Sequence, residues 1–213
     1  MSTNQYNVPV SNFSWAEGSR NNCFVVGRNT PILPSAFYTI SQNQDGSYSY
    51  NRQTIKTDEL IQFPKSLADD ILSEIDVFWN NTDKFKEYGF LQRRGYLFYG
   101  PPGTGKTALT EQIVDNTLRT GGVAFICRND PEDFADGLAW FRHYEPTRKI
   151  VCLFEDIDSL IDTYGESDLL SCLDGENQVD HVLNIATTNY PENLDKRIIN
   201  RPRRFDRVVK VGF

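Results

Sequence analysis

The sequence predicts an α/β fold in which a parallel β-sheet is flanked by helices. From residue 64 onward, short apolar runs alternate with segments whose apolar residues recur at helical spacing. The apolar runs are continuous, which is typical of strands buried on both faces of a parallel sheet. A glycine-rich loop stands between one such run and a helical segment, and a second run ends in a cluster of acids. Polar residues that follow parallel strands lie at the edge of the sheet where ligands bind.

The region before this alternation has a different composition. Residues 1–58 are rich in Asn, Ser, Tyr and Thr. Two alternating stretches, 36–40 and 47–57, flank a turn sequence at 43–46 and predict a β-hairpin. We therefore expect a small β-rich N-terminal region of unknown role at 1–58, followed by the α/β domain at 59–213.

Within the α/β domain, each element is expected from its own pattern. The first helix should lie between Pro64 and Asn80, where apolar residues recur at helical spacing. Strands are expected at 96–99, 123–127, 150–154, 181–187 and 208–211. Further helices are expected at 106–118, 131–143, 166–173 and 194–199.

Composition excludes several classes of protein. The chain has 213 residues, 39% of them hydrophobic and 24% charged, as in globular proteins, and its net charge is −7. An acidic chain has no general attraction for nucleic acid or an anionic membrane. No apolar run is long enough to span a bilayer and the N-terminus lacks the apolar core of a signal peptide, so a cytoplasmic location is expected. The four cysteines form no CxxC pair, which predicts buried thiols without zinc or disulfides.

The glycine-rich loop follows the pattern GxxxxGK[ST], which is specific for nucleotide phosphates. Glycines let the backbone N–H groups point at phosphate oxygens, Lys106 brings a positive charge near the β- and γ-phosphates, and the Thr107 hydroxyl binds magnesium. The helix that follows adds its N-terminal dipole. The sequence therefore predicts a site for ATP and Mg²⁺. Its candidate binding residues are Gly100, Pro101, Pro102, Gly103, Thr104, Gly105, Lys106, Thr107 and Ala108.

The acids at the end of the strand at 150–154 complete such a site. Glu155 and Asp156 follow the strand directly, one β–α unit after the loop. A phosphate loop requires one acid in the magnesium shell and one that orients or deprotonates the attacking water. Together with the loop, this pair predicts hydrolysis as well as binding.

The order and spacing of the motifs resemble those of the AAA clade of the AAA+ ATPases. The similar segments are the loop at 100–107, the acids at 155–158, Ala-Thr-Thr-Asn at 186–189 and Asn-Arg-Pro-Arg-Arg-Phe-Asp at 200–206. The resemblance covers about 59–213 and is greatest to the mitochondrial inner-membrane AAA chaperone that assembles respiratory complex III. It implies the large subdomain of a P-loop NTPase. Because the chain ends at Phe213, just after the last strand, we expect the helical lid to be absent.

The resemblance also assigns roles to individual residues. Glu155 takes the magnesium-side role together with Thr107, and Asp156 activates water, in an order that reverses the Asp-Glu usual in the family. Asn189 matches the sensor that positions water near the γ-phosphate. Arg201 and Arg204 match arginines that reach into the site of a neighbouring subunit. Such trans-acting arginines stabilise transition-state charge.

The resemblance therefore predicts an ATPase that forms a homo-oligomer, typically a ring of six, and remodels or chaperones proteins. Two alternatives stay open at this stage. A loader or another DNA-transaction ATPase belongs to the same superfamily, although the acidic charge counts against it. A nucleotide-gated scaffold with little turnover would agree with the reversed acids and the missing lid.

Overall fold

The structure is a computed structural model. It describes the backbone of residues 14–17 and 23–26 and, in full, residues 30–54, 67–174, 179–195, 198 and 204–212. The chain divides into two compact units, Met1–Pro34 and Ser35–Phe213. In the first unit, β1 (Ser14–Glu17) and β2 (Cys23–Val26) pair antiparallel. The second unit carries all the predicted site residues.

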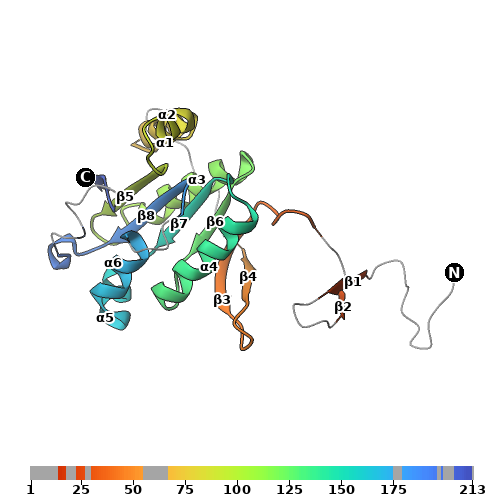
Figure 1. Ribbon diagram of the computed structural model, residues 1–213. Helices are drawn as coiled ribbons and strands as arrows, with labels where there is room; N and C mark the ends of the chain where they lie inside the picture. Colours follow the sequence, from red (N-terminus) through yellow and green to blue (C-terminus); the bar gives the residue numbers. More distant parts are fainter. Residues whose placement is uncertain are drawn as a thin grey trace. The chain divides into compact units, whose positions relative to one another are not determined.

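A seven-stranded sheet forms the centre of the second unit, with the strand order β4-β3-β6-β7-β8-β5-β9 (Figure 1). The strands are β3 (Phe37–Gln42), β4 (Tyr48–Gln53), β5 (Arg93–Tyr99), β6 (Val123–Ile126), β7 (Ile150–Phe154), β8 (Val182–Thr188) and β9 (Arg207–Lys210). Neighbouring strands are parallel except for the antiparallel pair β3–β4. This confirms the predicted α/β fold, and every strand predicted in the α/β domain is present.

The helices cover both faces of the sheet. They are α1 (Leu67–Asn80), α2 (Thr82–Glu87), α3 (Lys106–Arg119), α4 (Pro131–Tyr144), α5 (Ile157–Tyr164) and α6 (Glu166–Asp174), with a 3-10 turn at Pro191–Asn193. The helices α1, α3, α4 and α6 confirm their predictions, whereas α2 and α5 were not predicted. The helix expected at 194–199 falls largely outside the described residues. Within the described part of the chain, none of the helices combines the length and the apolar character needed to cross a membrane.

The predicted hairpin is present, and it belongs to the central sheet. Its turn closes with a hydrogen bond of 2.9 Å from the Gly46 N–H to the Asn43 carbonyl oxygen. Strand β3 pairs in parallel with β6, with Phe37 opposite Ala124. Because this pairing adds the hairpin to the sheet, the compact unit begins at Ser35 and not near residue 59.

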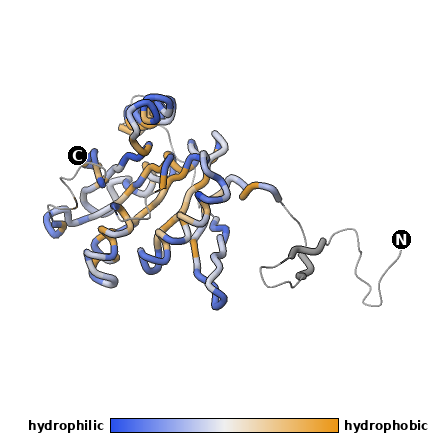
Figure 2. Tube along the Cα trace, in the orientation of Figure 1, coloured by the Kyte–Doolittle hydropathy of each residue, from blue (hydrophilic) through white to orange (hydrophobic). Residues whose placement is uncertain are grey.

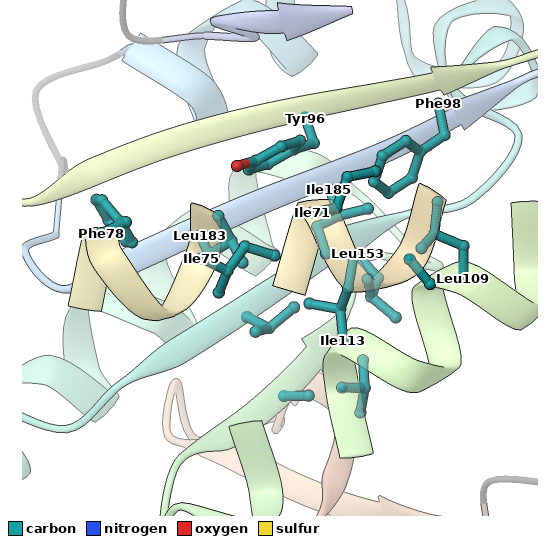
Figure 3. Close-up of a cluster of buried hydrophobic side chains, with 14 of the residues drawn as sticks. Ile71, Ile75, Phe78, Tyr96, Phe98, Leu109, Ile113, Leu153, Leu183 and Ile185 are labelled. Carbon is teal, nitrogen blue, oxygen red and sulfur yellow. The ribbon is translucent and has the colours of Figure 1, made fainter. Parts of the chain in front are cut away.

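The core consists of two apolar layers, one on each face of the sheet, and Figure 2 shows the hydrophobic strands between more polar helices. On one face, α1 and α3 contribute Ile75 and Ile113, which are fully buried in one apolar cluster with Phe98 of β5 (Figure 3). On the other face, Phe134 of α4 contacts Phe154 of β7 with ring centroids 5.7 Å apart. These layers fix the strands that carry the site residues.

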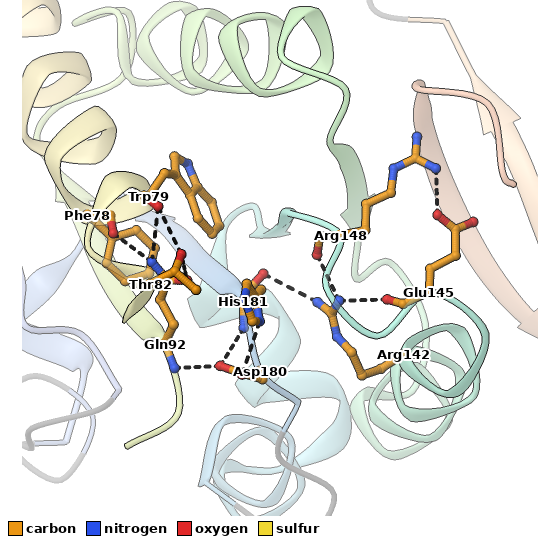
Figure 4. Close-up of polar contacts among 9 residues, drawn as sticks. All are labelled: Phe78, Trp79, Thr82, Gln92, Arg142, Glu145, Arg148, Asp180 and His181. Atoms are coloured by element: carbon orange, nitrogen blue, oxygen red, sulfur yellow. Dashed lines mark hydrogen bonds and ion pairs between the residues drawn. The ribbon is translucent and has the colours of Figure 1, made fainter. Parts of the chain in front are cut away.

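Polar contacts hold the amino ends of β5 and β8 (Figure 4). The Gln92 side chain donates to the Phe78 carbonyl at 2.7 Å, and its backbone N–H donates to the Asp180 carboxylate at 2.6 Å. Arg142 donates to the carbonyl oxygen of His181, just before β8. The amino-terminal edge of the sheet is thus tied by structural contacts, while the predicted site residues follow the opposite, carboxyl-terminal edge.

Candidate functional site

The glycine-rich loop joins β5 to α3 and curves tightly at its first glycine. Gly100 has φ of 151°, and a Cβ atom there would lie 2.3 Å from the carbonyl oxygen of Val211. Gly105 caps α3 in a left-handed conformation without a side-chain hydrogen bond to the first turn. The first N–H groups of a helix have no partner within the helix, so this helix end suits an anion.

Lys106 extends its ammonium group back across the loop. Its Nζ donates to the carbonyl oxygens of Gly100 and Pro101 at 2.7 and 3.0 Å and to Asn189 Oδ1 at 2.7 Å. The residue is only 8% exposed, and burial lowers the pKa of its ammonium while the nearby Asp156 opposes that shift. All three of these acceptors are neutral oxygens, so a buried positive charge faces a loop shaped for an anion. These residues therefore fit a nucleotide phosphate.

The contact between Lys106 and Asn189 brings together two residues that lie far apart in sequence. Asn189 directly follows β8, and β8 lies beside β5, the strand that leads into the loop. Because the two strands are parallel, their carboxyl ends meet at the same edge of the sheet. The structure thus places the predicted sensor side chain at the predicted phosphate lysine.

The two acids differ in environment although they are adjacent. Glu155 is partly buried, and its pKa is raised by burial, lowered by Arg128 and raised again by Asp156. It lines a cavity of about 320 Å³ together with Thr107 and Arg128. A hydroxyl and a carboxylate are the hard oxygen ligands that Mg²⁺ prefers, so Thr107 and Glu155 fit the metal roles predicted for them.

Asp156 is exposed and its backbone is strained. Its φ of 46° and ψ of 59° are left-handed, an uncommon conformation for a residue with a side chain. The Asp156 N–H donates to the Thr187 hydroxyl at 3.0 Å, which helps to hold this conformation. The strain occurs at the acid predicted to activate water.

The structure describes only one of the two arginines that were predicted to act on a neighbouring subunit. Arg201 lies outside the described residues. Arg204 is 4% exposed, and its Nε lies 2.5 Å from the Asp174 carboxylate of the same chain. A Cβ atom at Gly95 would lie 1.7 Å from the Arg204 carbonyl oxygen, so the Arg204 backbone packs directly against β5. The structure therefore differs from the expectation that Arg204 reaches into a neighbouring subunit, because its guanidinium is committed to an acid of its own chain.

Sequence reasoning missed several polar residues at the same edge. Arg128 follows β6, and the strand-end rule that selected Glu155 would also have selected it. Asp158 and Thr188 occur within the quoted motifs, but no role was predicted for either. They are joined by a hydrogen bond of 2.6 Å from the Thr188 hydroxyl to Asp158 Oδ2.

Comparison with known proteins matches residues 96–213 to the ATPase family associated with various cellular activities (AAA). The matched segment begins within β5 and contains the loop, the acids, Asn189 and both arginines. It covers more than half of the chain.

Curated proteins give consistent similarities. Protein CdcH of Halobacterium salinarum is 30% identical over 207 residues, covering 85% of this chain and 28% of that protein. The ATP-dependent zinc metalloprotease FtsH 2 of Thermoanaerobacter sp. is 30% identical over 161 residues, covering 68% and 31%. The peroxisomal ATPase PEX6 of Candida glabrata is 32% identical over 164 residues, covering 69% and 16%. The chain thus spans about a third or less of the length of these relatives.

Among solved structures, PCH-2 of C. elegans is similar in fold, with a TM-score of 0.56 at 22% sequence identity. The alignment covers 72% of this chain and 45% of that chain.

Proposed function

Because the chain belongs to the AAA family of ATPases, we propose that it binds ATP with magnesium on residues 100–108 and hydrolyses it to drive the remodelling of another protein. The observation that supports this most directly is the 2.7 Å contact between Lys106 and Asn189, at the edge of the sheet where Glu155 and Asp156 also follow a strand. Phosphate-binding, water-positioning and acidic groups therefore share one edge.

Each residue has a defined part in this proposal. Lys106 and the N–H groups at the start of α3 bind the phosphates, and Thr107 and Glu155 hold the magnesium ion. When bound, that ion neutralises charge that develops on the phosphate oxygens. Asp156 accepts a proton from the attacking water, while Asn189 orients that water.

The proposal is tested by phosphate release and nucleotide binding in two variants. Lys106→Ala should lose ATP affinity, because the positive charge that meets the phosphates is removed. Asp156→Asn should bind ATP normally but release phosphate about 100-fold more slowly or worse, since it lacks a general base. Asp162→Asn on α5 is the matched control, because Asp162 is an exposed acid outside the site. Equal rates in the wild type and both site variants would contradict the proposal.

The same test separates the alternatives. Tight ATP binding without turnover in the assembled wild type would instead identify a nucleotide-gated scaffold. Stimulation of the ATPase by DNA at low salt would favour a loader, although the net charge of −7 argues against this.

We further propose a homo-oligomer, with six subunits as is usual in the family, and a cytoplasmic location. Arg201 is our candidate for the arginine that acts on a neighbouring site, since Arg204 is bound to Asp174 in its own chain. Within the family, the Glu155–Asp156 order supports a closer relation to the chaperone of complex III assembly, which shares this reversal.

A further inference from the structure

The end of β8 carries two consecutive threonines whose hydroxyls contact the acidic loop after β7. Thr187 accepts from the Asp156 N–H at 3.0 Å, and Thr188 donates to Asp158 at 2.6 Å. Asp156 and Asp158 lie on either side of Ile157, the first residue of α5. The strand that ends just before the sensor residue Asn189 is therefore tied to the segment that carries the water-activating acid.

The Thr188 hydroxyl also fixes the backbone around Asn189. It accepts a hydrogen bond of 2.9 Å from the Tyr190 N–H while donating its proton to Asp158. Asn189 stands between Thr188 and Tyr190, so this hydrogen bond closes a short turn around its backbone, and the bond to Asp158 ties that turn to α5. Because Thr188 is fully buried, water cannot readily replace either bond.

The carboxylate of Asp158 is an unfavourable group to bury if its contact with Thr188 is only structural. Its second oxygen, Oδ1, is buried without a hydrogen-bond partner among the described residues. Buried acceptors are nearly always satisfied, and an exception calls for an explanation. A charged acceptor holds a hydroxyl about twice as strongly as a neutral one, so the carboxylate gives Thr188 a firmer anchor than an amide would.

We infer that Thr188 and Asp158 are positioning residues that set the Asn189 side chain relative to Asp156, an inference that rests on the proposed ATPase function. Asn189 Oδ1 lies 2.7 Å from Lys106 Nζ, so the anchor of Thr188 on α5 also determines how the sensor amide meets the phosphate lysine. The hydroxyl of Thr188 bonds Asp158 and the Tyr190 N–H, neither of which is proposed to contact ATP or the attacking water. The effect of Thr188 and Asp158 is therefore expected in turnover and not in nucleotide affinity.

The central experiment compares Thr188→Val with Thr188→Ser by steady-state phosphate release. Valine keeps the shape but removes both hydrogen bonds, and we expect kcat to fall about 10- to 100-fold with KM for ATP changed less than about 2-fold. Serine restores the hydroxyl and should retain kcat within about 3-fold of the wild type. Thr163→Val, which removes an exposed threonine hydroxyl on α5, is the matched control and should leave kcat unchanged. A normal kcat in Thr188→Val, or failure of serine to restore it, would overturn the inference.

A double-mutant cycle tests the pairing itself. Because Thr188 and Asp158 act through one contact, Thr188→Val combined with Asp158→Ala should be no slower than the slower single variant by more than about 3-fold. Independent, multiplicative losses would refute a shared role. If Thr188→Val does not fold, Asp158→Asn replaces it: a neutral acceptor should lower kcat about 3- to 10-fold at unchanged KM, and an unchanged kcat would refute the inference.

Amide hydrogen exchange provides a readout that does not depend on turnover. The Tyr190 N–H should exchange at least about 10-fold faster in Thr188→Val than in the wild type or Thr188→Ser, because its acceptor is lost. If the wild type showed no ATPase activity but Tyr190 exchange were still faster in Thr188→Val, the proposed function would be contradicted and the anchoring geometry supported. Unchanged Tyr190 exchange would refute the anchoring itself.

Discussion

Arg204 is the charged residue for which the structure and the resemblance differ most. Its guanidinium side chain is 5% exposed and bound to Asp174. Removing one partner of a buried ion pair leaves the other charge uncompensated, so Arg204→Ala should lower the free energy of unfolding by about 3–5 kcal/mol. Urea unfolding of the nucleotide-free chain measures this loss. Replacing both residues by apolar ones, as in Arg204→Met with Asp174→Leu, should cost less than Arg204→Ala. Unchanged stability in Arg204→Ala would show that the pair contributes nothing to the fold.

At the scale of single residues, some contacts of the site could be predicted from the sequence and others could not. Lys106 was predicted from the loop pattern and Asn189 from the family resemblance, and their contact follows because parallel strands bring their carboxyl ends to one edge of the sheet. The pairing of Arg204 with Asp174 depends on how a loop returns to the end of α6. The local sequence pattern predicts neither this contact nor the hydrogen bond between Thr188 and Asp158.

At the scale of the elements, strands and long helices could be predicted because they bury a continuous or periodic apolar surface. Helix α2 has only six residues and none is buried, so its sequence shows no recurrence of apolar residues at helical spacing from which to predict it. Helix α5 begins directly after the acids of the site, in a segment that was interpreted as a strand end. The hairpin was expected from its alternation and turn, but its pairing with β6 is a long-range contact that alternation does not encode.

The hairpin lies close to α4, and Gly137 makes this approach possible. A Cβ atom at Gly137 would lie 2.3 Å from Ile40 Cγ2 of β3, while the Tyr50 hydroxyl of β4 donates to the Gly137 carbonyl at 2.8 Å. Gly137→Ala should therefore destabilise the chain by about 1–3 kcal/mol, despite the better helix propensity of alanine, because it forces the hairpin off the helix. Thermal unfolding measures this effect. Since the clash is with Ile40, adding Ile40→Ala should cost less in the Gly137→Ala background than in the wild type. A stabilised Gly137→Ala variant would contradict the close packing.

For the whole molecule, the proposed ring makes each ATP site depend on two subunits. A trans-acting Arg201 and a cis-acting Lys106 then belong to different chains at every interface. Addition of ATP should increase the particle mass in solution toward a hexamer, as light scattering measures. Arg201→Ala and Lys106→Ala should each be nearly inactive alone, for different reasons: the first lacks the arginine for its neighbour, and the second lacks the phosphate lysine in its own site.

Mixing these two variants tests the arrangement. In a random ring with equal amounts of both, an intact site on an Arg201→Ala subunit meets an intact arginine from a Lys106→Ala subunit at one interface in four, so phosphate release should recover to roughly a quarter of the wild-type rate. Lys106→Ala mixed with Asp156→Asn is the control. Both of those defects lie in the same half of the site, so no interface is complete and no activity should return. If the first mixture were no more active than its separate components, Arg201 would not act across an interface, and the site would have to be completed within one chain.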